Sequence, residues 1–178
     1  MDISANTVKE LREKTGAGIM DCKRALQDSN GNMDKATELL RQRGLATSSK
    51  VAGREAKQGL IESYIHTGGR IGALVEVNCE TDFVARTDEF RTLAREIAMQ
   101  VASMNPTTVG SMEGGDESEG LLGQEYIRDS RKTIRDLIKE TIAQVRENIQ
   151  VSRFQRFEVG MSGAGEIDAV PAEEVAQS

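Results

Sequence analysis

Apolar residues recur at intervals of three and four along residues 1–45, which is the spacing of short amphipathic helices. Asn32 is a suitable N-cap for the third of these segments, and Gly44 suits the left-handed position just after a helix end. The pattern therefore predicts a compact three-helix module. Its apolar stripes are Val8 and Leu11, then Ile19, Cys22 and Leu26, and then Met33, Ala36, Leu39 and Leu40.

Residues 46–58 lack a sustained apolar period and carry several basic side chains, so they are interpreted as a linker that can be partly helical. Beyond them the apolar period changes to two, which predicts a strand over residues 70–79. Residues 59–67 are its expected partner, because Gly68–Gly69 suits a two-residue hairpin turn. One face of the second strand carries Ile71, Ala73, Val75, Val77 and Cys79.

This hairpin has a defined register, which places Tyr64 opposite Ala73 and Leu60 opposite Val77 on the apolar face. The other face then carries Ile61, Ile65 and Leu74. A sheet with one side in water does not usually have apolar residues on both faces. Because no spare helix is evident, we expect a second copy of the chain to cover this face and form a homodimer.

Helical spacing returns after Thr87, a good N-cap, and ends at Asn105–Pro106. A second long helix is expected over residues 124–148 and a third strand over 151–160. The two expected apolar stripes are Phe90, Leu93, Ala94, Ile97, Val101 and Met104, and Ile127, Ile134, Leu137, Ile138, Ile142 and Val145.

The predicted fold class is α+β, with a three-helix module followed by a core of three-stranded antiparallel sheet with packed helices. The core is expected over residues 59–160. Residues 110–123 are Gly-rich and acidic and are predicted to be a flexible insertion. Residues 161–178 have no core-forming pattern and are predicted to be a disordered tail.

The composition narrows the classes of function. With 178 residues and a formal net charge of −6, the chain is not expected to bind nucleic acid over a broad surface. The N-terminus has no apolar run after its charges and no stretch is long enough to span a membrane, so a cytoplasmic protein is expected. The two distant cysteines, Cys22 and Cys79, are interpreted as reduced, small core residues.

No motif points to an enzyme. The sequence contains no G-x-x-x-x-G-K-[ST] loop, no completed G-x-G-x-x-G and no G-x-S-x-G, and one histidine with two distant cysteines gives no zinc set. No cofactor or metal site is therefore expected. A small enzyme that uses Cys79, His66 or a pair of carboxylates remains an alternative, with His66 interpreted as a surface residue beside the hairpin turn.

One aromatic residue stands out. The chain has four Phe, two Tyr and no Trp, and Phe83 alone falls at a turn, in the segment VNCETDFVAR. It can fold back over the edge of the core, or it can project into a pocket of a partner, since aromatic residues dominate interface hot spots. Asp82 beside it can orient the turn or pair with that partner.

Three segments resemble the elongation factor Ts family: LREKTGAGIMDCKRAL with ATELLRQRG, then VEVNCETDFVAR, then NIQVSRFQRFEVG. The resemblance covers residues 1–104 and 124–160. It implies guanine-nucleotide exchange on elongation factor Tu, bound in both its GDP-bound and its nucleotide-free forms. It also implies that the segment Thr81, Asp82, Phe83 and Val84 is a wedge: Phe83 enters an apolar pocket of the GTPase domain, and GDP leaves when the Mg²⁺ site is disturbed.

The resemblance further implies that the N-terminal module, which is similar to a ubiquitin-associated (UBA) domain, contacts the GTPase separately. By motif match the contacts are Arg12, Ile19, Met20 and Lys23, although Ile19 also fits the core stripe of the module. The short members of the family are dimers, and a bacterial cytoplasm or a plastid that encodes its own copy is the expected location. A protein-interaction protein of UBA type without exchange activity remains the alternative.

Overall fold

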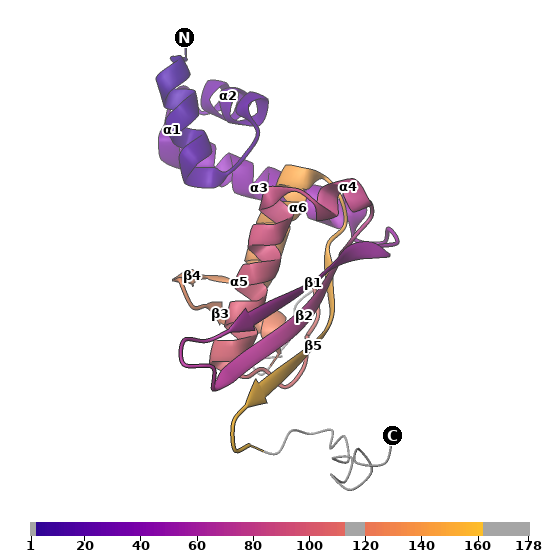
Figure 1. The fold of residues 1–178 in the computed structure, drawn as a ribbon. Coiled ribbons are helices and arrows are strands. Elements are labelled where there is room, and N and C mark those ends of the chain that lie inside the picture. Colours follow the sequence, from indigo (N-terminus) through magenta and orange to yellow (C-terminus); the bar gives the residue numbers. More distant parts are fainter. Residues whose placement is uncertain (1–2, 113–119, 162–178) are drawn as a thin grey trace, which may run out of the picture.

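The computed structural model describes residues 3–112 and 120–161, which form two groups of helices and one main sheet (Figure 1). A mixed α+β fold with a three-stranded antiparallel sheet is confirmed. The elements follow in the order α1 (Ala5–Thr15), α2 (Ile19–Asp28), α3 (Met33–Val51), β1 (Gln58–Ile65), β2 (Ile71–Cys79), α4 (Asp82–Ala85), α5 (Asp88–Met104), the 3₁₀ helix η1 (Leu121–Gly123), β3 (Glu125–Tyr126), β4 (Asp129–Thr133), α6 (Ile134–Val145) and β5 (Gln150–Glu158).

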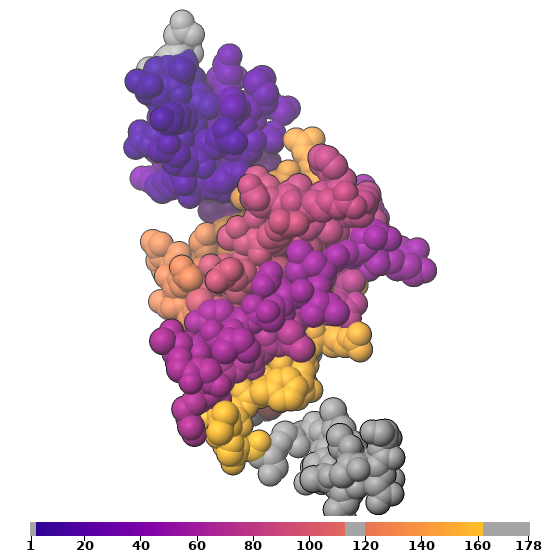
Figure 2. All heavy atoms as spheres, in the orientation of Figure 1, coloured from indigo at the N-terminus to yellow at the C-terminus, as the bar shows by residue number. Residues whose placement is uncertain are grey.

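The first three helices have a small hydrophobic core of their own, and Figure 2 shows them as a lobe beside the rest of the molecule. Leu11, Cys22 and Leu26 are fully buried in it. Ile19 is exposed, so its expected place in the core stripe is wrong. The side chains of the later turns of α2 fill the space between the helices, and Ile19, the first residue of α2, lines an open hollow instead.

The third helix is longer than predicted, because it continues through Gly44 to Val51 and takes in part of the expected linker. Gly44 is buried in mid-helix, and a Cβ built on it would lie 3.2 Å from the Cβ of Ala143 on α6. The glycine thus allows a close approach of α6, and the helix end expected at this position was wrong.

The three-stranded sheet has the order β1-β2-β5, with β2 in the centre. The predicted hairpin register is confirmed: Tyr64 pairs with Ala73, and Leu60 with Val77. The inner face of the sheet packs on α5, and both lie in one continuous core with α6. The expected stripe of α5 is buried except at its end, where Met104 is exposed because it is the last residue of the helix.

The helix expected over residues 124–148 is wrong in its first part, which forms the β3–β4 hairpin. Gln100, fully buried on α5, holds this hairpin through its amide: Nε2 donates to the carbonyl of Glu125 at 3.0 Å, and Oε1 accepts from the backbone N of Ile127, also at 3.0 Å. Ile127, expected inward, is exposed, and Tyr126 lies on a strand.

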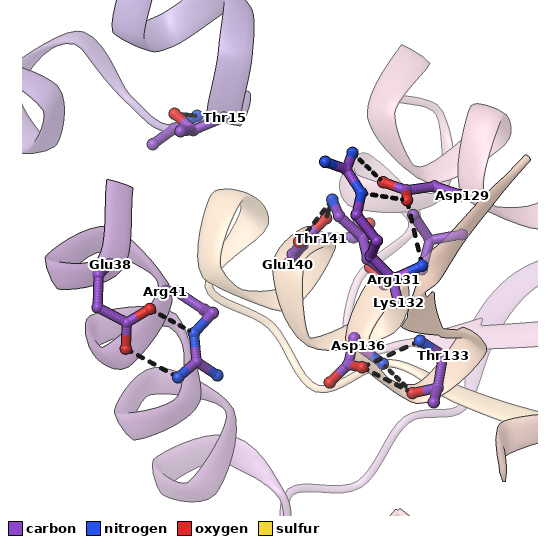
Figure 3. A network of polar contacts seen from close by, with 12 residues as sticks. Thr15, Glu38, Arg41, Asp129, Arg131, Lys132, Thr133, Asp136, Glu140 and Thr141 are labelled. Carbon is purple, nitrogen blue, oxygen red and sulfur yellow. Dashed lines mark hydrogen bonds and ion pairs between the residues drawn. The ribbon is translucent and has the colours of Figure 1, made fainter. Parts of the chain in front are cut away.

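α6 begins only at the capping box formed by Thr133 and Asp136. The Thr133 backbone N and hydroxyl both donate to the Asp136 carboxylate, at 3.0 and 2.8 Å (Figure 3). The side chains of the preceding strand are held by their own ion pairs in the same view, including Lys132 with Glu140. These local bonds fix the strand-to-helix transition at Thr133.

The insertion expected over residues 110–123 contains a buried part. Leu121 and Leu122 are buried in the main core, and the backbone N of Leu121 donates to the Thr108 carbonyl. Within the expected insertion, residues 113–119 lie outside the described residues, as does the expected tail from residue 162 onward.

Candidate partner-binding site

The segment that carries Phe83 folds into α4, a single helical turn directly after β2. Thr81 is its N-cap, and the Thr81 hydroxyl accepts from the backbone N of Val84 at 3.3 Å. Val84 and Ala85 are buried and attach the turn to the core. The chain therefore makes a short, anchored projection at this point.

Phe83 is 76% exposed, the largest value among the big apolar side chains of residues 3–112 and 120–161. The interpretation that it folds back over the core edge is wrong. Asp82 is also at the surface, where its carboxylate pairs with Arg86 one turn later at 2.8 Å. Among the four residues expected to form the wedge, the structure exposes Thr81, Asp82 and Phe83 and buries Val84.

The backbone of Thr81 is held from two sides. Its carbonyl accepts from the thiol of Cys79 at 3.1 Å, and its backbone N donates to the carboxylate of Glu147, beyond the end of α6. Burial raises the pKa of the Cys79 thiol to about 11, with the charge of Glu147 as a further cause. Cys79 is thus a neutral donor at physiological pH. Glu147 was not among the predicted site residues, because no periodic pattern marks it.

A second candidate surface lies on the N-terminal helices. Ile19 and Met20 are 55% and 60% exposed at the start of α2. Arg12 and Lys23 line, together with Ile19, an adjoining hollow of about 400 Å³ between α1 and α2. Arg12, Ile19 and Lys23 therefore lie around one hollow, and Met20 is exposed next to Ile19 in the sequence without lining it.

The outer face of the sheet is a third exposed apolar surface. Ile61 and Ile65 are each 67% exposed and Leu74 is 46% exposed, as the alternation predicted. Phe157, which the sequence interpretation did not include, pairs with Gly72 on this face and is also exposed. Ile65 lies over Gly72 from the other side, since a Cβ there would come within 2.6 Å of its Cδ1.

The structure does not bring together Cys79 and His66, two of the residues that the alternative of a small enzyme would use. Cys79 pairs with the first residue of β1, whereas His66 follows the last, so roughly 25 Å of strand separate them. His66 is exposed and bonds the Tyr64 hydroxyl at 3.1 Å. Among these residues no group of three or more His, Cys, Asp or Glu could hold a metal ion. None of the described helices combines the length and the apolar character needed to cross a membrane.

Comparisons with known proteins agree with the resemblance seen in the motifs. A family model described as Elongation factor TS matches residues 5–118 and 80–164. Elongation factor Ts of Thermoanaerobacter sp. (strain X514) is 48% identical over 194 residues, covering 89% of this chain and 95% of the relative. Elongation factor Ts of Trichodesmium erythraeum (strain IMS101) is 48% identical over 212 residues, covering 98% and 96%. That of Fervidobacterium nodosum is 45% identical over 196 residues, covering 90% and 100%.

Proposed function

The chain belongs to the elongation factor Ts family, and from this premise we propose that it is a guanine-nucleotide exchange factor for elongation factor Tu. The observation that carries the proposal is Phe83, a large apolar side chain held in solvent on an anchored helical turn. An exposed aromatic side chain contributes little to its own fold but can contribute about 1.5–3 kcal/mol when a partner buries it.

Phe83 is the wedge of the proposed mechanism. It inserts between elements of the GTPase domain that support Mg²⁺, with Asp82 beside it at the entrance. Mg²⁺ requires near-ideal octahedral geometry, so a small displacement of its supports weakens the hold on GDP. No catalytic group of this chain is needed, because the factor only has to bind the nucleotide-free GTPase better than the GDP-bound form. By linkage, bound GDP lowers the affinity of the GTPase for the factor by the same ratio as the bound factor lowers its affinity for GDP.

The surface of Arg12, Ile19, Met20 and Lys23 is the proposed second contact with the GTPase. Its apolar centre and the basic side chains around it are complementary to a partner surface with apolar side chains surrounded by carboxylates. Since α1–α3 and the wedge belong to one chain, binding at one surface raises the effective concentration of the other.

The outer face of the sheet is the proposed homodimer interface. Ile61, Ile65, Leu74 and Phe157 would leave water together when two copies pack face to face. Light scattering coupled to gel filtration tests this directly: we expect twice the chain mass of 19.4 kDa, and a mass near that value refutes the dimer. The relatives come from bacteria and cyanobacteria, which favours a bacterial cytoplasm as the site of action.

The experiment that tests the function is release of a fluorescent GDP analogue from elongation factor Tu, with and without this chain and with excess unlabelled GDP. Strong acceleration at catalytic amounts of the chain supports exchange. Binding without acceleration would instead leave the alternative of an interaction module, in which case residues 1–45 alone would account for the binding. No acceleration and no binding would refute both.

A further inference from the structure

Three consecutive residues after α6 each contact a different part of the chain. Arg146, which ends the helix in the left-handed conformation, pairs with Asp21 of α2 at 3.3 Å. Asn148 donates from its side chain to the carbonyl of Arg54, in the segment before β1, at 2.7 Å. Glu147 between them is bonded to the β2–α4 loop. Residues 146–148 therefore form a junction between the N-terminal helices, the segment before the sheet and the segment that carries Phe83.

The carboxylate of Glu147 accepts three hydrogen bonds from two neighbouring residues. Oε2 accepts from the backbone N of Glu80 at 3.1 Å and from that of Thr81 at 3.0 Å. Oε1 accepts from the Thr81 hydroxyl at 2.7 Å. The attachment is reciprocal, because the Glu80 carboxylate accepts from the backbone N of Asn148 at 2.7 Å. Charge-assisted bonds of this kind are about twice as strong as neutral ones.

This attachment acts on the residue that sets the direction of α4. Thr81 is the N-cap, so its backbone conformation fixes where the turn begins and where Phe83, two residues later, points. A single helical turn does not hold its shape alone, because nucleation of a helix is unfavourable. Phe83 is too exposed to fix its own position, and the buried Val84 and Ala85 hold only the far side of the turn.

We propose that Glu147 is a positioning residue for nucleotide exchange: its carboxylate holds the Glu80–Thr81 backbone and so presents Phe83 in the orientation that the GTPase receives. This inference rests on the proposed function, to which it adds a residue 64 positions away from the wedge (147 minus 83). Without this attachment Phe83 is still present but less ordered. Its ordering then occurs on binding to the GTPase and costs part of the binding free energy.

The first test needs no partner. We would measure amide hydrogen exchange at Glu80 and Thr81 in wild type, Glu147→Ala, Glu147→Gln and the control Glu140→Gln. Glu140 carries the same charge on α6 but pairs with Lys132, away from the loop. We expect exchange at the two amides to rise at least about tenfold in the Ala variant, less in the Gln variant, which keeps one acceptor oxygen, and to stay unchanged in the control. Unchanged exchange in the Ala variant would overturn the proposal.

The second test is a double-mutant cycle with Phe83→Ala, measured as the rate of GDP release from elongation factor Tu. Glu147→Ala should lower the rate on the order of tenfold when Phe83 is present and hardly at all when it is absent. Partial rescue by Glu147→Gln is expected, and this variant carries the same comparison should the Ala variant fold poorly. Equal losses in both backgrounds would show a merely structural role and refute positioning.

The two tests separate the failure of this inference from that of the proposed function. A wild-type chain that does not accelerate GDP release refutes the exchange function, and with it any role of Glu147 in exchange. In that case the amide measurement still shows whether Glu147 orders the loop. Acceleration that is unaffected by Glu147→Ala would keep the function and refute the positioning role alone.

Discussion

Replacing Phe83 with alanine should weaken the interaction with the GTPase and leave the stability of the chain nearly unchanged. The side chain is 76% exposed, so its removal should change the free energy of unfolding by no more than about 0.5 kcal/mol and the melting temperature by no more than about 2 °C. Burial of the same side chain in a partner contributes about 1.5–3 kcal/mol, which corresponds to about a 12- to 160-fold lower efficiency of GDP release.

The assay is stopped-flow release of a fluorescent GDP analogue over a series of factor concentrations, with melting followed by circular dichroism. Met104→Ala is a matched control, since Met104 is a large exposed apolar residue at the far end of α5, about 25 Å of helix away. Phe83→Leu should give an intermediate loss, because it keeps part of the apolar surface. A Phe83→Ala variant within about threefold of wild type, or one no worse than Met104→Ala, would refute the wedge.

The other surfaces and the buried thiol are open to tests of their own. Met20→Ala should weaken binding to the GTPase about three- to tenfold, measured by titration. The release rate at saturating factor should stay nearly unchanged, because Met20 contacts the GDP-bound and the nucleotide-free GTPase equally well. A changed saturating rate would contradict this. Leu74→Arg should halve the mass measured by light scattering, since it places a charge within the proposed dimer face; an unchanged mass would exclude that face. The pKa of Cys79 is raised to about 11, so only about one thousandth of this thiol is ionised at pH 8. Iodoacetamide should therefore modify it at pH 8 about a hundred times more slowly than an unfolded thiol of pKa 9.0, and the rate should rise about tenfold per pH unit until about pH 11. Rapid modification of the folded chain at pH 8 would show that the thiol is not buried.

Local patterns in the sequence predict part of the fold. The period of two and the Gly68–Gly69 turn together fix the register of the β1–β2 hairpin, so the pairing of Tyr64 with Ala73 follows from the sequence alone. The β3–β4 hairpin cannot be derived in this way. Its strands are two and five residues long, and it is held by the amide of Gln100, which precedes Glu125 by 25 residues. The sequence around Glu125 does not indicate this contact with Gln100.

The same distinction applies to the candidate site. Phe83 could be singled out because the chain has few aromatic residues and this one falls beside a strand end. Glu147 could not, since its bonds reach residues 66 and 67 positions earlier and a glutamate between a helix and a strand is ordinary in any sequence. The apolar spacing placed Ile19 in the core stripe, whereas the motif match placed it at a contact with the partner. The spacing was wrong, because it identifies a stripe but does not show where neighbouring helices stop covering it.

The length of α3 changes how the two proposed contacts with the GTPase can cooperate. A flexible linker over residues 46–58 would let the N-terminal helices bind on their own, and the wedge would gain only from proximity. Instead α3 runs unbroken to Val51, with Gly44, Ser48 and Val51 buried, and Arg146 joins α6 to α2. Much of the entropy of ordering the two surfaces is therefore already lost in the free chain. The N-terminal helices and the wedge can therefore bind together with little further loss of entropy, and the contact at Met20 contributes to affinity without changing the step in which GDP leaves.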